Sequence, residues 1–333
     1  MEKNHPEVKY GKTGILIVNL GTPDSTKWYD IRKYLKEFLS DKRVIEVNPF
    51  LWKIILNIFI LNFRPSKTAE AYKKIWMKKE NMSPLRHYTI MQAKNLSNKI
   101  SDEKIIVDYA MRYGNPSIFK KINFLQKQGC ENIIILPLYP QYAAATTATV
   151  CDEVYRSLMK MRWQPSLQII PHYESEPLYI QALKNSLNKK LSEIKWKPDL
   201  IVASYHGIPK KYFDKGDPYH CYCQKTSRLL KENLQGDIPI MTTFQSRFGP
   251  QEWLKPYTDK TLEKLPKDEK KNILMICPGF SSDCVETLEE IGIQGKETFM
   301  NNGGKNFDIV PCLNDNNDHI DLFLHLIKKY VGK

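Results

Sequence analysis

The sequence lacks the glycine-rich loops with which many α/β proteins bind nucleotides. The loop after the first apolar run reads Asn19-Leu20-Gly21-Thr22-Pro23 and lacks the second and third glycines of a dinucleotide-binding fingerprint. A complete phosphate-binding loop with its Lys-Ser/Thr pair is also missing. These absences argue against dehydrogenase and ATPase functions.

The sequence also lacks an apolar run long enough to cross a membrane. Segment 50–63 has eleven apolar residues in fourteen. As a helix it spans about 21 Å, against roughly 30 Å for a hydrocarbon core. It is interpreted either as a buried core helix or as an exposed lip that dips into a membrane surface or borders a large apolar ligand. Arg64 follows directly, where a lipid phosphate or a ligand carboxylate would meet it.

Paired cysteine motifs are scarce. The seven cysteines are an odd number, and residues 1–12 are too polar for a signal peptide. We therefore expect free thiols and a reducing, cytoplasmic location. Cys221 and Cys223 form one close pair, but no second pair stands at zinc-ribbon spacing, so no metal site is expected there.

Acidic residues are outnumbered, with 37 Asp and Glu against 50 Lys and Arg, which gives a net charge of +13. Such a charge suits an anionic ligand, an anionic membrane surface or nucleic acid. The lysines are scattered, however, and no nucleic-acid-binding module is recognisable. We expect no nucleic-acid partner and interpret most of the charge as a solvated surface.

What the sequence does contain is a regular alternation of short apolar runs and longer helical patterns. This alternation is typical of an α/β fold, in which parallel sheets are covered by helices on both faces. Expected strands are 13–20, 105–111, 132–138, 167–171, 199–205, 238–244, 272–277 and 307–311. Expected helices are 29–39, 66–79, 87–99, 115–128, 147–161, 177–193, 223–233, 257–264, 284–300 and 317–331.

The two halves of this pattern are alike in outline. Residues 132–142 and 272–282 are each a strand that ends in a proline-containing loop before a helix. We expect two similar Rossmann-like lobes with a cleft between them. The first lobe is expected over 1–165 and includes the apolar lip. The second is expected over 166–333 and carries the metal-site residues, and its last helix packs back on the first lobe.

Two strands end in residues suited to proton and metal chemistry. The run Ser204-Tyr205-His206-Gly207-Ile208-Pro209 delivers His206 at the carboxyl end of a buried strand, where open α/β sheets bind ligands. A second strand leads through a loop to Glu286 at the start of a helix. A neutral imidazole accepts protons and binds borderline metals. The pair predicts a site that moves protons and holds a divalent metal, whereas a structural histidine is the alternative.

Carboxylates continue along the same helix. Glu286 and Glu290 are four residues apart and share one helix face. Asp283 is explained as a helix cap, and an acidic first turn also stabilises the helix dipole. A row of carboxylates that leads inward suits proton or cation delivery.

Aromatic and cationic side chains follow other strands. Tyr139 and Tyr142 come directly after an apolar run and suit stacking on a flat ligand. Arg247, with Trp253 close behind it, is a natural carboxylate partner. Arg112 is placed similarly, at the end of another strand.

Taken together, these stretches resemble the ferrochelatase family, whose members insert ferrous iron into a porphyrin. Six blocks follow the family's order within residues 12–330, and the match is to the bacterial protoporphyrin-type branch. The blocks are Asn-Leu-Gly-Thr-Pro at 19–23, Tyr-Pro-Gln-Tyr at 139–142, Ser-Tyr-His-Gly-Ile-Pro at 204–209, Gly-Asp-Pro-Tyr at 216–219, Thr-Phe-Gln-Ser-Arg-Phe-Gly at 243–249 and Asp-Cys-Val-Glu-Thr-Leu-Glu-Glu at 283–290.

The resemblance implies roles for individual residues. The family's invariant histidine falls on His206 and its active-site glutamate on Glu286, which are the implied iron-binding pair, and the second helix carboxylate falls on Glu290. The implied substrate contacts are Arg64, Ser83 and Arg247 near the porphyrin propionates, Trp253 and Tyr142 among the pocket aromatics, and Leu20 at the macrocycle face. Segment 50–63 matches the family's apolar lip, which borders the pocket and touches the membrane.

The chain departs from some relatives in two places. Those relatives hold an iron–sulfur cluster through a pocket-side cysteine and a cysteine-rich C-terminal tail, whereas this chain has Ala143-Ala144-Ala145 in the loop and ends without such a tail. We therefore expect no cluster and no permanently bound cofactor, with Fe²⁺ as a substrate. A third helix carboxylate of some relatives is Gln294 here, which questions a full acidic relay to the surface.

The expected function is Fe²⁺ insertion into protoporphyrin IX to make haem b, the final step of haem biosynthesis. Coproporphyrin or another tetrapyrrole metal chelatase is the near alternative. A non-catalytic haem or porphyrin carrier would need the pocket aromatics but not Glu286, and a binding protein for an anionic metabolite would show no porphyrin affinity. The expected location is cytoplasmic, with peripheral contact to the inner membrane, and the oligomeric state is left open.

Overall fold

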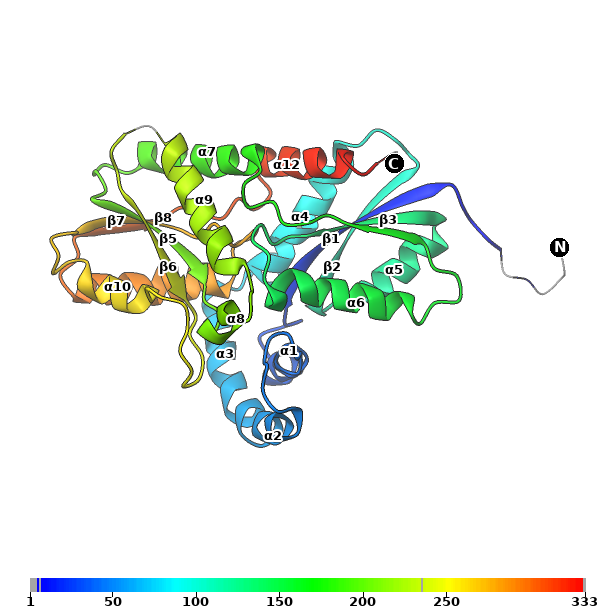
Figure 1. Ribbon diagram of the computed structural model, residues 1–333, viewed down its shortest axis with the longest axis horizontal. Coiled ribbons are helices and arrows are strands. Elements are labelled where there is room, and N and C mark those ends of the chain that lie inside the picture. The colour runs from blue at the N-terminus through cyan, green and yellow to red at the C-terminus, as the bar shows by residue number, and fades with distance from the viewer. Residues whose placement is uncertain (1–4, 6, 235, 332–333) are drawn as a thin grey trace.

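All eight expected strands form, and they divide into two parallel sheets (Figure 1). The computed structural model describes residues 5, 7–234 and 236–331. The first sheet has the order β2-β1-β3-β4 and consists of β1 (Lys12–Thr22), β2 (Ile105–Gly114), β3 (Cys130–Pro137) and β4 (Ser166–Ile169). The second has the order β6-β5-β7-β8 and consists of β5 (Leu200–His206), β6 (Ile240–Gln245), β7 (Asn272–Ile276) and β8 (Asn306–Ile309). The two sheets repeat one strand order, so the prediction of two similar α/β lobes is confirmed.

Helices cover both faces of each sheet. The first lobe contains α1 (Trp28–Leu39), α2 (Pro49–Ile55), η1 (Leu56–Ile60), α3 (Leu61–Ile75), α4 (Pro84–Asn98), α5 (Ile118–Lys127), η2 (Ala144–Ala148) and α6 (Thr149–Leu158). After β4 come α7 (Pro177–Glu193), α8 (Lys210–Asp214), α9 (Tyr219–Asn233), α10 (Thr258–Lys264), η3 (Glu286–Gly295), α11 (Lys296–Asn301) and α12 (Asn317–Lys328). The η segments are π-helical, with hydrogen bonds to the carbonyl five residues back. The segment η3 lies within the helix expected over 284–300, but its π-helical geometry, like that of η1 and η2, and the short helix α8 were not expected from the sequence.

One apolar core is continuous across both lobes. Residues 15–18 of β1 have no exposed surface, because helices pack on both faces of the sheet and the strand is apolar throughout. The cluster that contains Ile134 of the first sheet also contains Ile201 of the second, together with apolar residues of α7 and α12. The lobes therefore share a core.

The helices α7 and α12 cross between the lobes. The helix α7 follows the first sheet but packs on α9 of the second lobe, and α12 follows the second sheet but packs on α4 of the first. They pack against each other along one edge of the molecule (Figure 1), where Asn185 Nδ2 of α7 donates to Asp318 Oδ2 of α12 at 2.8 Å. An ion pair at the end of α4 joins Lys99 Nζ to Asp321 Oδ1 of α12 at 2.5 Å.

The boundary between the lobes was expected between residues 165 and 166, which would assign β4 to the second lobe. Residues 166–169 pair in parallel with β3, so they belong to the first sheet. The first lobe therefore extends to Ile169, and the chain passes to the second lobe through 170–176. The outer limits expected for the lobes, residues 1 and 333, lie outside the described residues.

The apolar lip, residues 50–63, begins with a well-formed helix start. The side chain of Asn48 accepts hydrogen bonds from the N–H groups of Phe50 and Leu51 at 3.0 and 3.2 Å. Pro49 occupies the first turn, where a helix has no use for the missing N–H. A π-helical turn then joins α2 to α3, so the lip is one continuous helical arm that projects from the body (Figure 1).

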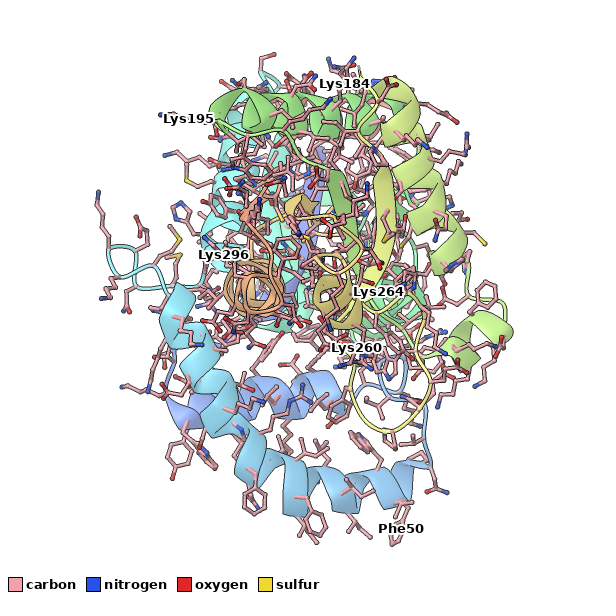
Figure 2. All side chains as sticks on the ribbon, turned by 90° about the vertical axis from the view of Figure 1, so that its left-hand side faces the viewer. Phe50, Lys184, Lys195, Lys260, Lys264 and Lys296 are labelled. Atoms are coloured by element: carbon pink, nitrogen blue, oxygen red, sulfur yellow. The ribbon has the colours of Figure 1, made fainter. Side chains whose placement is uncertain are left out.

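This lip is exposed, and the interpretation as a buried core helix is wrong. Leu56 and Leu61 are buried against the first lobe, but Phe50, Phe59 and Phe63 are 77%, 57% and 76% exposed. Figure 2 shows Phe50 at the outer end of the arm, turned away from the body. In the part of the chain that the structure describes, no helix is long and apolar enough to cross a membrane.

Candidate active site

His206 is the last residue of β5, as predicted, and the backbone around it fixes its ring. Its Nδ1 lies 2.7 Å from the carbonyl oxygen of Gly207. A carbonyl oxygen only accepts hydrogen bonds, so Nδ1 carries the hydrogen and Nε2 keeps its lone pair. The half-buried imidazole therefore presents a basic, metal-binding nitrogen.

Gly207 allows a close approach that a larger residue would prevent. A Cβ at this position would lie 2.9 Å from the backbone oxygen of Gln245 and 3.3 Å from the ring of Trp253. Trp253 is itself fixed, because its Nε1 donates to the Phe248 carbonyl at 3.0 Å. Trp253 is thus packed behind the loop that carries His206.

Glu290 lies beside the end of β6, the neighbour of β5. Its carboxylate accepts hydrogen bonds from Ser246 N at 2.8 Å, Ser246 Oγ at 2.5 Å and Gln245 Nε2 at 3.4 Å. Burial raises the pKa of Glu290 and the charge of Glu286 adds to the rise, while Ser246 and the charge of His206 oppose it. Glu290 is thus within electrostatic reach of both the predicted base and the predicted metal-binding carboxylate.

Glu286 begins η3 and faces residues of the first lobe. Burial raises the pKa of Tyr72, and the Glu286 charge adds to that rise. Burial lowers the pKa of the Arg64 guanidinium, and the same Glu286 charge opposes the change. Leu20 packs in the same small cluster as Cys284, two residues before Glu286. The predicted metal site therefore lies where the second lobe meets the first.

Arg64 is poised for a ligand. Its Cζ lies over the Phe248 ring, 4.5 Å from the centroid. Its Nη1 is buried and has no hydrogen-bond partner within the described residues. A buried donor without a partner is costly. An anionic group bound from outside would satisfy it.

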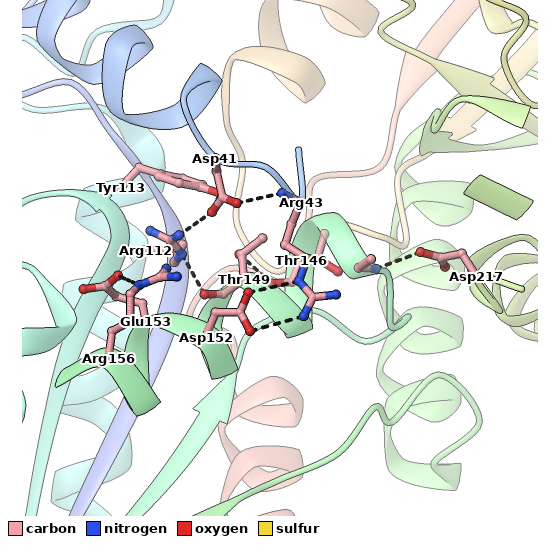
Figure 3. Close-up of polar contacts among 11 residues, drawn as sticks. Asp41, Arg43, Arg112, Tyr113, Thr146, Thr149, Asp152, Glu153, Arg156 and Asp217 are labelled. Carbon is pink, nitrogen blue, oxygen red and sulfur yellow. Dashed lines mark hydrogen bonds and ion pairs between the residues drawn. The ribbon is translucent and has the colours of Figure 1, made fainter. Parts of the chain in front are cut away.

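Arg112, a predicted substrate contact, is engaged within the first lobe. Its Nη2 forms an ion pair with Asp41, its Nε donates to the Thr149 carbonyl at 2.8 Å, and its guanidinium lies over the Tyr113 ring (Figure 3). The side chain is only 6% exposed. Its charge stabilises the packing of the loop after α1 on the first sheet.

Two other predicted propionate contacts are engaged elsewhere. The Arg247 guanidinium pairs with Asp259 and lies 4.1 Å from the centroid of the Tyr257 ring, so it faces α10. Ser83 is buried at the start of α4, where its Oγ accepts from Arg86 N at 3.2 Å. A helix cap explains its side chain without any ligand.

The two predicted aromatic contacts after β3 differ in burial. Tyr139 is 9% exposed and packs with apolar residues of the first lobe. Its hydroxyl is buried without a hydrogen-bond partner among the described residues. Tyr142 is half-buried, and its place beside η2 leaves part of its ring available to a ligand.

Sequence reasoning missed Gln245, Ser246 and Glu289. Gln245 ends β6 and Ser246 follows it, in the block that drew attention to Arg247, so a polar pair at a strand end was the available signal. Glu289 is 4% exposed and forms an ion pair with Lys74 of α3 at 2.8 Å. Nothing in the local pattern set it apart from Glu290.

Other hollows and clusters lie away from these residues. A surface cavity of about 440 Å³ is bordered by Tyr88, Lys189, Asn314 and other residues of α7 and the loop before α12, and contains none of the predicted site residues. Within the described residues, no three His, Cys, Asp or Glu side chains come together as a metal-binding group.

Known proteins match the chain along nearly its whole length. The ferrochelatase family profile matches residues 12–331. The chain belongs to the ferrochelatase family. Ferrochelatases of Allorhizobium ampelinum and Rhizobium meliloti are 53% and 54% identical to it over 99% and 98% of this chain and 96% of each of theirs. The ferrochelatase of Francisella tularensis subsp. tularensis is 53% identical over 97% of both chains.

Solved chelatase structures share the fold of this ferrochelatase-family chain. SirB from Bacillus subtilis with Fe³⁺ is similar with a TM-score of 0.61 and 12% identity, over 97% of this chain and 96% of its own. CbiX, the terminal enzyme for biosynthesis of siroheme in denitrifying bacteria, is similar with a TM-score of 0.51 and 12% identity, over 96% of this chain and 100% of its own. At these identities the likeness shows the two-lobed fold alone.

Proposed function

We propose that the chain inserts Fe²⁺ into protoporphyrin IX, which releases two protons and produces haem b in the final step of haem biosynthesis. Membership in the ferrochelatase family supports iron insertion into a porphyrin. The structural observation that carries the proposal is the bond of His206 Nδ1 to Gly207 O, which leaves Nε2 as the basic atom of a ring whose charge interacts with Glu290.

His206 is the proton acceptor and an iron ligand. Each pyrrole N–H that loses its proton leaves an electron pair on nitrogen, which binds the iron. Nε2 of His206 is the basic atom, because Nδ1 already holds its hydrogen against Gly207 O. Glu286 binds iron beside it or passes protons on. Glu290, whose pKa is raised by burial, is suited to take up a proton.

A site built from an imidazole and carboxylates holds iron only loosely. Fe²⁺ is a borderline cation that binds thiolates and imidazoles better than carboxylates. With His206, Glu286 and Glu290 but no thiolate ligand, the iron is released to the stronger set of four porphyrin nitrogens. Loose binding is what a metal substrate requires.

Distortion of the macrocycle lowers the barrier. A flat porphyrin keeps its nitrogen lone pairs in plane, out of reach of the metal. Binding that favours a saddled macrocycle stabilises the transition state more than the flat ground state. Trp253 is 8% exposed and hydrogen-bonded to Phe248 O, which makes it a fixed surface against which a ring can bend. Leu20 and Tyr142 are the other predicted ring contacts.

Arg64 binds a propionate and orients the porphyrin. Its buried, unpartnered Nη1 matches the need for a charge-assisted hydrogen bond to a carboxylate. Arg247 joins it only if its guanidinium leaves Asp259. Ser83 is expected to contribute less to propionate binding than Arg64, since its oxygen already caps α4.

The apolar lip supports the more apolar protoporphyrin and a peripheral contact with the cytoplasmic face of a membrane. The lip also contains two asparagines, and their side chains are hydrogen-bonded to the backbone of the same helix. Asn57 Nδ2 donates to the Lys53 carbonyl and Asn62 Nδ2 to the Ile58 carbonyl, both at 2.7 Å. These bonds satisfy polar groups within the helix and lower the cost of placing it among lipid chains.

We also propose that no cofactor is permanently bound. The loop after Tyr142 is Ala143-Ala144-Ala145 and offers no thiolate to an iron–sulfur cluster. Analysis of the purified protein for iron and acid-labile sulfide tests this, and stoichiometric amounts of both would contradict it.

The test of function is anaerobic insertion of Fe²⁺ into protoporphyrin IX, followed by the loss of porphyrin fluorescence. Wild type is expected to turn over, and His206→Ala is expected to bind porphyrin without turnover. His325→Ala, which removes a half-exposed histidine on α12, is the matched control and is expected to behave as wild type. Glu286→Gln separates a chelatase, which loses turnover, from a carrier, which keeps its binding function.

Each outcome has a distinct meaning. Tight porphyrin binding without turnover in wild type, with Fe²⁺, Co²⁺ and Ni²⁺ each tried, would favour the carrier. Faster turnover with coproporphyrin than with protoporphyrin would overturn the choice of substrate but keep the reaction.

A further inference from the structure

Gln245 joins the two elements that carry the proposed base and carboxylates. Its backbone oxygen accepts from Gly207 N at 2.8 Å, directly after His206. Its side-chain Nε2 donates to the Glu286 carbonyl oxygen at 2.8 Å, at the start of η3. One residue of β6 thus fixes the His206 loop on one side and the first turn of the acidic helix on the other.

The direction of the Gln245 amide is set by a buried hydroxyl. Ser204 Oγ donates to Gln245 Oε1 at 2.7 Å, and the Thr258 hydroxyl lies 2.9 Å from Ser204 Oγ. All three residues are at most 3% exposed. Because Oε1 is engaged as an acceptor, Nε2 must face η3 and Glu290.

Ser246 holds the carboxylate of Glu290 by an unusual backbone conformation. Its φ is +66°, in the left-handed region that residues with a side chain avoid. This conformation turns both N–H and Oγ toward Glu290, at 2.8 and 2.5 Å, one to each carboxylate oxygen. Strained backbone at a site of this kind persists where the surrounding contacts require it.

The length of η3 makes such anchoring necessary. Ten consecutive residues are π-helical, Glu286–Gly295, a geometry that is rare and mostly confined to single turns. A change in its winding would rotate Glu290 relative to His206. The contacts from Gln245 and Ser246 oppose that rotation from the neighbouring strand.

We propose that Gln245 and Ser246 are positioning residues for iron insertion, which fix the carboxylate of Glu290 beside His206. The proposal rests on the role proposed above for Glu290. The side chains of both residues donate to Glu286 and Glu290, and no hydrogen bond among the described residues joins them to Arg64, so their loss is expected to affect the use of iron and to leave porphyrin binding intact. Loss of comparable supporting hydrogen bonds typically costs ten- to a hundredfold in activity.

The test compares Ser246→Ala and Ser246→Gly with wild type, by kcat and KM for Fe²⁺ and by porphyrin affinity from fluorescence. Both variants lose Oγ, but glycine favours a φ of +66° and alanine does not. The expected order of kcat/KM for iron is wild type, then Ser246→Gly, then Ser246→Ala, with a loss of about tenfold or more in Ser246→Ala. Porphyrin affinity is expected to stay within about twofold of wild type.

A double-variant cycle with Glu290→Gln shows whether Ser246 acts through Glu290. Ser246→Ala is expected to cause no further loss in the Glu290→Gln background, because residues that act as one unit are not additive. Additive losses, or equal activity of Ser246→Ala and wild type, would overturn the inference. Wild-type activity of Glu290→Gln would instead overturn the role of Glu290.

Two further variants guard against simple misfolding. Ser157→Ala removes a buried serine hydroxyl that donates to the Glu153 carbonyl at 2.7 Å in the first lobe, and it is expected to keep wild-type kinetics. Gln245→Met keeps the side-chain volume but removes the donor to Glu286 O. It is expected to lower kcat/KM for iron with unchanged porphyrin affinity, and a variant that loses both equally would contradict a positioning role.

Discussion

Lys74 Nζ of α3 lies 2.8 Å from Glu289 Oε1 of η3, in an ion pair that links residues 215 positions apart. The helix α3 also carries Arg64, and η3 carries Glu286 and Glu290. Gln294 Nε2 donates to the other oxygen of the Glu289 carboxylate at 2.7 Å. The pair therefore ties the proposed propionate ligand to the acidic helix.

Breaking this ion pair is expected to lower both thermal stability and the apparent affinity for porphyrin. Glu289 is 5% exposed in its side chain, so Lys74→Gln leaves a buried carboxylate with Gln294 as its remaining partner. Lys74→Gln should lower Tm more than Glu289→Gln, which removes the charge itself. The exchange of both residues, Lys74→Glu with Glu289→Lys, should recover part of the loss. If both single variants keep the wild-type Tm in low and in high salt, the pair is not structural.

Arg64 and Arg247 are expected to differ in their contribution to porphyrin binding. Arg64→Met keeps volume over Phe248 but removes a charged donor, which is worth about 1.5–3 kcal/mol, or roughly ten- to a hundredfold in KM. Arg247→Met should change KM much less, since that guanidinium faces Asp259. A porphyrin dimethyl ester, which has no propionate charge, should bind to wild type and Arg64→Met alike. A larger effect of Arg247→Met would mean that its side chain turns inward on binding.

His319 is expected to make stability depend on pH on the acid side. It is fully buried, and burial lowers its pKa to about 4 from an ordinary value of 6.5. The unfolded chain therefore binds a proton that the folded chain does not, and stability falls as pH decreases from about 6.5 to about 4. The loss amounts to about 3 kcal/mol at 1.36 kcal/mol per pH unit.

Urea unfolding between pH 4 and 7 measures this dependence. His319→Leu should be less stable at pH 7, because its bond to the Asn314 carbonyl is lost, but should show a flatter dependence on pH. His325→Leu, on the exposed side of the same helix, is the control and should keep the wild-type slope. An unchanged slope in His319→Leu would assign the acid sensitivity to other groups.

The apolar lip is expected to bind lipid. Phe50→Ser with Phe59→Ser removes two exposed rings, each worth about 1.5–3 kcal/mol when fully buried, so binding to vesicles of mixed zwitterionic and anionic lipid should fall more than tenfold. Phe124→Ser on α5, also an exposed phenylalanine at 46%, should bind vesicles as wild type does. Turnover of detergent-dispersed porphyrin should be similar in all three proteins. Equal vesicle binding by the lip variant and wild type would contradict the membrane contact.

Much of the fold and part of the site were predictable from local sequence. Short apolar runs marked every strand, most clearly the central strands β1 and β5, which are buried along most of their length and can hold few polar residues. The position of His206 at a strand end followed from the same reasoning, since the run that precedes it is apolar and Gly207 ends it. Glu286 and Glu290 were found because their spacing places both on one face of a helix.

The rest depended on partners far away in the chain. Arg112 and Asp41 are separated by 71 residues, and only the folded chain reveals that they pair. Arg247 faces Asp259 through a choice of rotamer that no pattern encodes. The exposure of the lip was undecidable from its composition, because a buried helix and a membrane-facing helix are equally apolar.

The packing of α7 and α12 ties the two lobes together mechanically. Each half of the chain supplies a wall to the other half's core, so neither half keeps its hydrophobic interior covered when alone, and we expect the whole to unfold as one unit. A hinge motion that separates the two sheets would break this shared core, so we do not expect one. The part that moves when a flat ring enters and a metallated ring leaves is therefore expected to be the one that lies outside the shared core, the helical arm with its exposed phenylalanines.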